Sequence, residues 1–224
     1  RAAASSAALR LRSSSSAAAF CFCSASRASF LTGRIPSQHG VHDFIKGDAN
    51  YGPDAATFLE DEVCYTDVLA ENGWTCGFSG KWHLGNSTLT QHGFTHWFAH
   101  PGGAGEYNDH MMIRNGKMEV APGYVTNVIT DDALDFIGSH AEDDNPFYLS
   151  VHYTAPHCPW TGHPQDIVDS YDDCPFDSCP QEELHPWAKV PDIDPNGPWA
   201  SGGGLSHNMG NRESLKGYFG SVTA

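Results

Sequence analysis

The sequence has few basic residues and no long apolar segment, and both shortages limit what the chain can bind. Its 12 Lys and Arg stand against 27 Asp and Glu, which gives a formal net charge of -15 at pH 7. A charge of this sign repels phosphate backbones and anionic membrane surfaces. The chain also lacks the run of about 18 apolar residues that a membrane-spanning helix requires. We therefore expect neither nucleic acid nor a membrane among its partners.

Residues 1–20 contain no carboxylate and very few large apolar side chains. The stretch is a low-complexity mixture of Ala and Ser with three Arg. Such a composition cannot form a packed core, so we expect a disordered tail, a transit-like leader or mistranslated sequence. There is no initiating Met and no charged-then-apolar signal peptide, so the amino terminus does not indicate a compartment.

Residues 21–224 have the length and patterning of one domain or of part of a larger one. Helical and extended patterns alternate along this part of the chain, which favours an α/β layered sheet. The residues between 158 and 204 are rich in Pro, Gly, Asp and Trp and predict a long irregular excursion. The regular elements expected from the pattern are helices at 66–72, 130–137 and 213–224, and strands at 74–79 and 147–153.

Cys23 opens the segment CSASRASFLTGR, which the pattern predicts to be a loop entering a helix that ends near Thr32. Ser24 and Ser26 are good capping residues, and no helix breaker follows before Gly33. This places Cys23 at a helix amino terminus, where unpaired N–H groups and the helix dipole favour an anion. Taken alone, however, Cys23 is more simply interpreted as a buried thiol or half of a disulfide.

Lys81 and His83 lie in the segment GKWHLG, just past the carboxyl end of the predicted strand at 74–79. Ligands of open α/β sheets bind at this edge. On an extended backbone the two residues would face the same side, so both could reach one anion. The alternative is that they are turn residues that flank a packed Trp82.

Residues 23–34 resemble the sulfatase signature C-x-[PA]-S-R-x-x-x-L-T-G-R, and GKWHLG at 80–85 is similar to a second block of the same family. The resemblance implies an alkaline-phosphatase-like α/β/α sandwich with a mostly parallel central sheet, of which residues 21–224 would be a part. It also implies a sulfuric ester hydrolase that acts on a sulfated carbohydrate or an aryl sulfate, either as a small molecule or within a polysaccharide.

The resemblance further implies a role for each site residue. Cys23 would be oxidised by a formylglycine-generating enzyme, and the hydrated aldehyde would attack the sulfur of the ester. Arg27 would brace this group, and Lys81 would bind the sulfate and the hydrate. His83 would take a proton so that sulfate is expelled, and His157 in TAPHCPW would donate a proton to the leaving alcohol. Without the resemblance, His157 is simply a hydrogen-bonded structural residue.

Calcium is the metal that the family uses, held by Asp and Asn oxygens together with the formylglycine at Cys23. The family's first Asp pair would fall within residues 1–20, and its later Asp-Asn pair with an accompanying Lys would fall beyond Ala224. Asp131 and Asp132 suggest a substitute, but behind Thr130 they are more simply first-turn residues of a helix. We therefore expect the polypeptide as given to be weakly active or inactive, although its full-length relative would be a sulfatase.

Two other functions fit the same residues. One is a phosphoesterase or phosphonate hydrolase of the same superfamily, and the other is a catalytically inactive sulfatase-like fragment or binding module. A zinc site is a third, weaker interpretation, because His92, His96 and His100 would align on a helix. Gly93 and the neighbouring aromatic residues oppose that helix, and His92-Gly93-Phe94 resembles a sulfatase segment instead.

Cysteine usage bears on the compartment. Seven Cys are present, so conversion of Cys23 would leave an even number. An even number favours disulfides and an oxidising compartment. Together with the compartments that are usual for the family it resembles, this predicts secretion or a Golgi-lysosomal route.

Overall fold

The computed structural model describes residues 23–179 and 211–224. The low-complexity residues 1–20 and the later part of the predicted excursion, from residue 180, therefore lie outside the described residues. No helix among the described residues is both long enough and apolar enough to cross a bilayer.

A five-stranded sheet in the order β4-β3-β2-β1-β5 forms the centre of the molecule. β1 pairs in parallel with β2 on one side and with β5 on the other. β3 and β4 extend the sheet beyond β2 in antiparallel pairing. The α/β prediction is confirmed, but the sheet is parallel only across its three strands β2, β1 and β5. The strands span Thr75–Lys81 (β1), Phe94–His100 (β2), Met111–Arg114 (β3), Lys117–Val120 (β4) and Phe147–His152 (β5).

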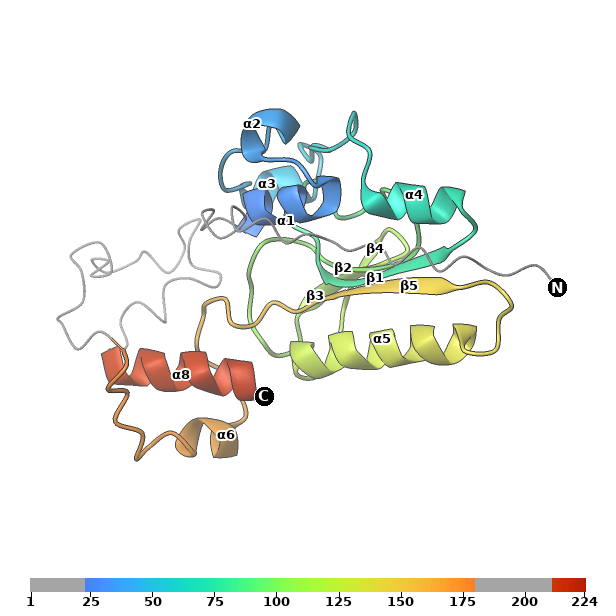
Figure 1. The fold of residues 1–224 in the computed structure, drawn as a ribbon. Coiled ribbons are helices and arrows are strands. Elements are labelled where there is room, and N and C mark those ends of the chain that lie inside the picture. The colour runs from blue at the N-terminus through green and yellow to red at the C-terminus, as the bar shows by residue number, and fades with distance from the viewer. Residues whose placement is uncertain (1–22, 180–210) are drawn as a thin grey trace.

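Helices cover both faces of this sheet, as an α/β/α sandwich requires. In Figure 1, α1 to α4 lie over one face and α5 lies against the other, while α6 and α8 pack together at one end of the molecule. The helices span Cys23–Thr32 (α1), Pro36–His39 (α2), Gly47–Asn50 (α3), Tyr65–Glu71 (α4), Val125–His140 (α5), Gln165–Asp169 (α6) and Asn211–Thr223 (α8). Most predicted boundaries agree to within two residues.

β1 is the middle one of the three parallel strands, with β2 on one side and β5 on the other, and its sequence suits that place. Phe78 is fully buried and packs against the rings of Trp82, Phe94 and Trp97. On the other side, Gly80 allows β1 to approach β5 closely, because a Cβ at this position would lie 2.0 Å from the carbonyl oxygen of His152. The backbone of Gly80 also has φ +114°, which disfavours other residues. This packing fixes the ends of β1 and β5 side by side.

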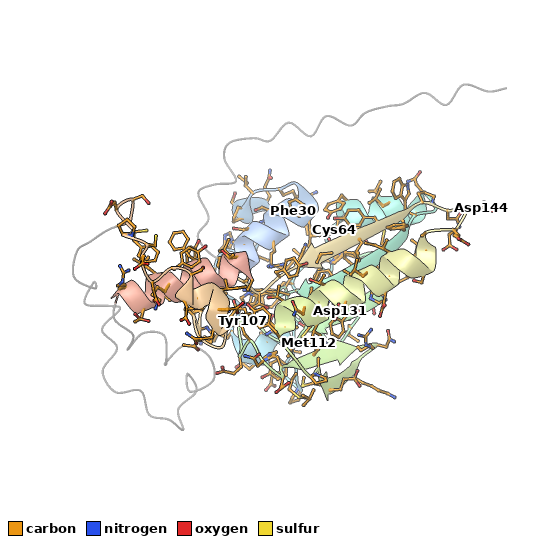
Figure 2. All side chains as sticks on the ribbon, turned by 90° about the horizontal axis from the view of Figure 1, so that it is seen from below. Phe30, Cys64, Tyr107, Met112, Asp131 and Asp144 are labelled. Carbon is orange, nitrogen blue, oxygen red and sulfur yellow. The ribbon has the colours of Figure 1, made fainter. Side chains whose placement is uncertain are left out.

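The prediction for Asp131 and Asp132 is wrong. Helix α5 begins at Val125, five residues before Thr130, so the two acids lie inside the helix rather than in its first turn (Figure 2 labels Asp131 on α5). Asp132 is buried and accepts hydrogen bonds from Arg114 at 2.7 Å and from His96 at 2.9 Å. It ties α5 to the sheet.

Replacing Asp132 by Asn should destabilise the fold by about 1–3 kcal/mol, because two charge-assisted hydrogen bonds are weakened at a buried position. Burial alone would raise the pKa of Asp132, but the hydrogen bond and charge of His96, helped by Ser79 and Arg114, lower it below its usual 3.8. The stabilisation is therefore present above that value and is lost as the pH falls through the folded-state pKa. Urea unfolding at several pH values should show this acid loss in the wild type and a smaller loss in the variant. An equal loss in both would contradict the assignment.

The zinc interpretation of the three histidines is also wrong, because residues 94–100 form strand β2 rather than a helix. His92 lies before the strand and pairs with Asp67 at 3.1 Å, whereas His96 pairs with Asp132. His100 hydrogen-bonds within the turn that follows β2. The three imidazoles therefore have separate partners.

The cysteines of the described residues form no disulfide. Those present as free thiols are Cys23, Cys64, Cys76, Cys158, Cys174 and Cys179. The structure thus gives no support to the disulfides that the even remainder of cysteines favoured.

Candidate active site

Three adjacent parallel strands end in basic side chains at the same edge of the sheet. The last residues of β2, β1 and β5 are His100, Lys81 and His152. The pairing register places Lys81 beside His100 and Gly80 beside His152. Because carboxyl ends of parallel strands are where α/β sheets bind ligands, this row marks the candidate site. Lys81 is the last residue of β1 rather than a residue just past it.

Cys23 begins α1, as predicted, and its side chain is partly exposed. Cys23 and Lys81 lie close enough for the thiol to influence the protonation of the amine. Lys81 itself is almost completely buried. Burial lowers the pKa of Lys81 to about 8, although the nearby Cys23 acts in the opposite direction. Lys81 is thus a cation at neutral pH, close to the predicted nucleophile.

Arg27 stands one helical turn after Cys23 and reaches the same strand ends. Its guanidinium donates to the carbonyl oxygen of Lys81 at 2.5 Å and to Nδ1 of His152 at 2.6 Å. Burial lowers the pKa of Arg27 to about 10, so the group stays charged at neutral pH. Burial and the charge of Arg27 lower the pKa of His152 to about 4, which keeps this ring neutral and able to accept.

His152 was not predicted as a site residue. Its position near the end of the strand predicted over 147–153 is the sequence feature that could have indicated it. The structure places this strand beside β1, which carries Lys81.

His83 is fully buried and does not continue the extended backbone of β1. Its φ is +56°, so the expectation that Lys81 and His83 point the same way along a strand is wrong. The ring nitrogen Nε2 lies 3.0 Å from the carbonyl oxygen of Ile45, to which it must donate. Nδ1 is buried without a hydrogen-bond partner. The turn after β2 covers this ring, and a Cβ on Gly103 would lie 2.4 Å from it.

The electrostatics of His83 favour a neutral imidazole. Burial lowers its pKa to about 3, and the charges of Lys81 and Arg27 and the nearby His157 add to this effect. With Nε2 carrying the proton, Nδ1 presents a free lone pair. His83 can therefore accept a proton at Nδ1.

His157 joins the cluster from the loop after β5. Its Nδ1 donates to the carbonyl oxygen of Cys158 at 2.7 Å, which leaves Nε2 available. Tyr107, labelled in Figure 2, donates from its hydroxyl to the backbone oxygen of His157 at 2.8 Å. Burial and the charge of Lys81 lower the pKa of His157. Burial raises the pKa of Cys158, while the charge of Lys81 acts in the opposite direction and that of Cys23 adds to the increase. Cys158 is therefore a second thiol near these groups, and the sequence did not indicate it.

The structure thus gathers Cys23, Arg27, Lys81, His83 and His157 at one sheet edge, within reach of one another's charges. Within residues 23–179 and 211–224, no carboxylate forms an ion pair with Arg27 or Lys81. Two cations without an anionic partner form a site that can bind an anion.

Calcium does not fit these surroundings. Ca²⁺ takes roughly six to eight oxygen ligands. The described groups around Cys23 are a thiol, an ammonium, a guanidinium and imidazoles, and the acidic stretch at 142–144 lies elsewhere. Figure 2 shows Asp144 at the end of the molecule opposite Tyr107, which is hydrogen-bonded to the His157 loop. Calcium therefore has no part in the steps proposed below.

One group of side chains in the described part of the chain has the spacing of metal ligands. The ligand atoms of Cys64, Asp67 and His92 lie within 4.8 Å of one another. Cys64 and Asp67 already form a capping box at the start of α4, and His92 hydrogen-bonds to the same carboxylate. These contacts account for the arrangement as a helix cap. A mainly soft ligand set of thiol and imidazole is also unlike a calcium site.

Comparison with known proteins bears on these residues. The sulfatase family model matches residues 4–222. An N-acetylglucosamine-6-O-sulfatase of Bacteroides thetaiotaomicron is 32% identical over 144 residues, which cover 63% of this chain and 23% of that protein. The N-acetylgalactosamine-6-sulfatase of Canis lupus familiaris is 29% identical over 160 residues, 61% of this chain and 31% of that protein. The chain thus spans less than a third of these two curated relatives.

Solved structures agree with this match. One is a protein in complex with its substrate D-glucosamine-2-N,6-O-disulfate; it is 29% identical with a TM-score of 0.56, over 68% of this chain and 28% of that chain. Another, from glycosaminoglycan metabolism in Bacteroides thetaiotaomicron, is 21% identical with a TM-score of 0.65, over 90% of this chain and 43% of that chain. The second likeness concerns the fold alone, and it agrees with the predicted fold class.

Proposed function

This chain belongs to the sulfatase family, and on that premise we propose that the protein carrying it hydrolyses sulfate esters at the cluster around Cys23. The observation that carries the proposal is that the buried Lys81 lies near the thiol of Cys23, with Arg27, a second and partly buried cation, bound to the backbone of Lys81. A sulfate ester is an anion, and this pair of cations offers it charge compensation where no described carboxylate competes.

A formylglycine made from Cys23 would supply the oxygen nucleophile, as the hydrate of its aldehyde. The position fits such a group, because the side chain is partly exposed at a helix amino terminus and lies near the amine of Lys81. Lys81 would hold the ester's sulfate against residue 23 and stabilise the negative charge that develops on its oxygens. Arg27, fixed by the backbone of Lys81 and by His152, would hold the two elements in register.

The two histidines would move protons. Nε2 of His157 is free, because Nδ1 is bound to the carbonyl of Cys158, and it would donate a proton to the departing alcohol oxygen. Nδ1 of His83 has the free lone pair and would accept the proton whose removal lets sulfate leave. Both rings stand close enough to Lys81 for its charge to lower their pKa values.

The relatives support a substrate class. The two curated enzymes and the first solved structure compared above are named for 6-O-sulfated amino sugars, so we propose a 6-O-sulfated hexosamine as the first substrate to test, with an aryl sulfate as a general probe. We also propose that a formylglycine-generating enzyme acts on Cys23 and that the protein follows a secretory or Golgi-lysosomal route. Calcium is an expectation from the resemblance alone, and the described residues around Cys23 do not include the oxygen ligands that it requires.

Mass spectrometry of the peptide that contains Cys23 tests the proposal. Co-expression with a formylglycine-generating enzyme should replace the CH₂–SH side chain by an aldehyde, and the Cys23→Ala variant should lack both this mass and any turnover of aryl sulfate. An unmodified thiol under these conditions would count against the sulfatase proposal. Faster turnover of aryl phosphate than of aryl sulfate would favour the phosphoesterase instead.

A further inference from the structure

We infer that Asn50 is a positioning residue that fixes the ring of His83 for its part in sulfate-ester hydrolysis. The inference rests on the proposed function for the role of His83, but the placement of the ring can be tested without it. Asn50 is the last residue of the short helix α3, and it is fully buried. Its side-chain hydrogen bonds go to backbone groups of Ile45, Lys46 and Gly85 and to none of the reacting side chains, so we expect its effect on the reaction to pass through His83.

Asn50 joins the two chain segments that determine where His83 lies. Its side-chain amide donates to the carbonyl oxygens of Ile45 at 3.4 Å and Lys46 at 2.8 Å. Its side-chain oxygen accepts the backbone N–H of Gly85 at 3.3 Å. One buried side chain thus uses donors and acceptor together to hold the turn before α3 against the segment that follows His83.

The carbonyl of Ile45 is the point at which this network reaches the ring. It accepts from Nε2 of His83 at 3.0 Å and from the amide of Asn50, which together use both of its lone pairs. The N–H of Ile45 donates to the hydroxyl of Ser24, the residue next to Cys23, at 3.4 Å. Phe44 adds a ring contact with His83, with centroids 5.2 Å apart. The turn at 44–46 therefore connects His83 to the start of α1.

This arrangement decides which nitrogen of His83 carries the proton. A carbonyl oxygen only accepts, so the Ile45 carbonyl requires the proton on Nε2 and leaves Nδ1 as the base. Without Asn50, the Ile45 carbonyl loses the donor that holds it in place. The opposite tautomer could then become populated, and it has no base at Nδ1. Asn50 would thereby set the tautomer as well as the orientation of the ring.

Two variants test the inference. Asn50→Ala removes all three side-chain hydrogen bonds, and Asn50→Asp keeps the acceptor for Gly85 while losing both donors. Asn72→Asp is the matched control, because the amide of Asn72 also donates to a backbone carbonyl, that of Val68 at 2.8 Å, but on the exposed end of α4. Two-bond ¹H–¹⁵N spectra of ring-labelled protein, assigned with His83→Gln, report the tautomer of His83.

We expect the wild type and Asn72→Asp to show only the Nε2–H form of His83, and both Asn50 variants to show the Nδ1–H form as well. Their kcat for an aryl sulfate should fall about tenfold or more, while KM changes much less, because misplaced catalytic groups lose rate rather than binding. An unchanged tautomer in folded Asn50→Asp would overturn the inference, whatever happened to the rate. If the tautomer changes but the full-length wild-type protein, with residue 23 converted, cleaves no sulfate ester, the placement of His83 stands and the proposed function fails.

Discussion

Replacing Lys81 by Met will lower kcat/KM for a sulfate ester by about 10²- to 10³-fold, the loss that accompanies removal of one preorganised donor to a developing anion. Met keeps most of the length and volume of the side chain but removes the charge. The wild-type amine is buried, lies near residue 23 and is not ion-paired to any described carboxylate, so its charge remains available to the substrate. Steady-state kinetics with an aryl sulfate measure the effect.

The pH dependence separates lost charge from damaged packing. Since burial lowers the pKa of Lys81 to about 8, the amine is charged below that pH and neutral above it. The wild-type kcat/KM should therefore fall as the pH rises through about 8, whereas Lys81→Met should lack this alkaline limb. Lys117→Met, on the exposed strand β4, is the control and should change neither quantity. An alkaline limb that persists in Lys81→Met would show that another group titrates there.

The sequence predicted those parts of the fold that depend on local pattern. Cys23 begins a helix, and residues 147–152 form a strand that leads into His157. The helix follows from a stretch without breakers before Gly33 and the strand from an apolar run, and both signals act within a few positions of the chain. The predicted caps Ser24 and Ser26 lie inside α1 instead, and the hydroxyl of Ser24 accepts from the N–H of Ile45. The grouping of Cys23, Lys81 and His157 was expected from family resemblance and from the edge rule for parallel sheets, and the structure does place them together.

The parts that were missed depend on partners distant in the sequence. The sequence did not predict the role of Asp132, which accepts hydrogen bonds from Arg114 and His96 on two strands of the sheet. His83 leaves the extended conformation because its ring is bound to Ile45, 38 residues earlier. His152 gains its place from Arg27, 125 residues away. Periodicity carries no information on such contacts, because they arise only when the layers pack.

Replacing His157 by Asn will affect substrates unequally, according to how much their leaving group needs a proton. For an alkyl ester such as a 6-O-sulfated hexosamine, kcat/KM should fall by about 10²- to 10⁴-fold, the usual contribution of a general acid. For a nitrophenyl sulfate, whose leaving group departs as an anion, the fall should be about tenfold or less. Asn can still donate a hydrogen bond to the Cys158 carbonyl, but it cannot transfer a proton from the position of Nε2.

The pH dependence of the same variant has a definite sign. Because burial and the charge of Lys81 lower the pKa of His157, its protonated form gains population only as the pH falls. The wild-type kcat/KM for the alkyl sulfate should rise from neutral toward acidic pH, and that of His157→Asn should not. His140→Asn is the matched control, since His140 also places Nδ1 at 2.8 Å from a backbone oxygen, that of Phe136, but at the far end of α5. Equal losses for the two leaving groups would assign His157 to substrate binding rather than to proton transfer, because only a proton donor distinguishes a poor leaving group from a good one.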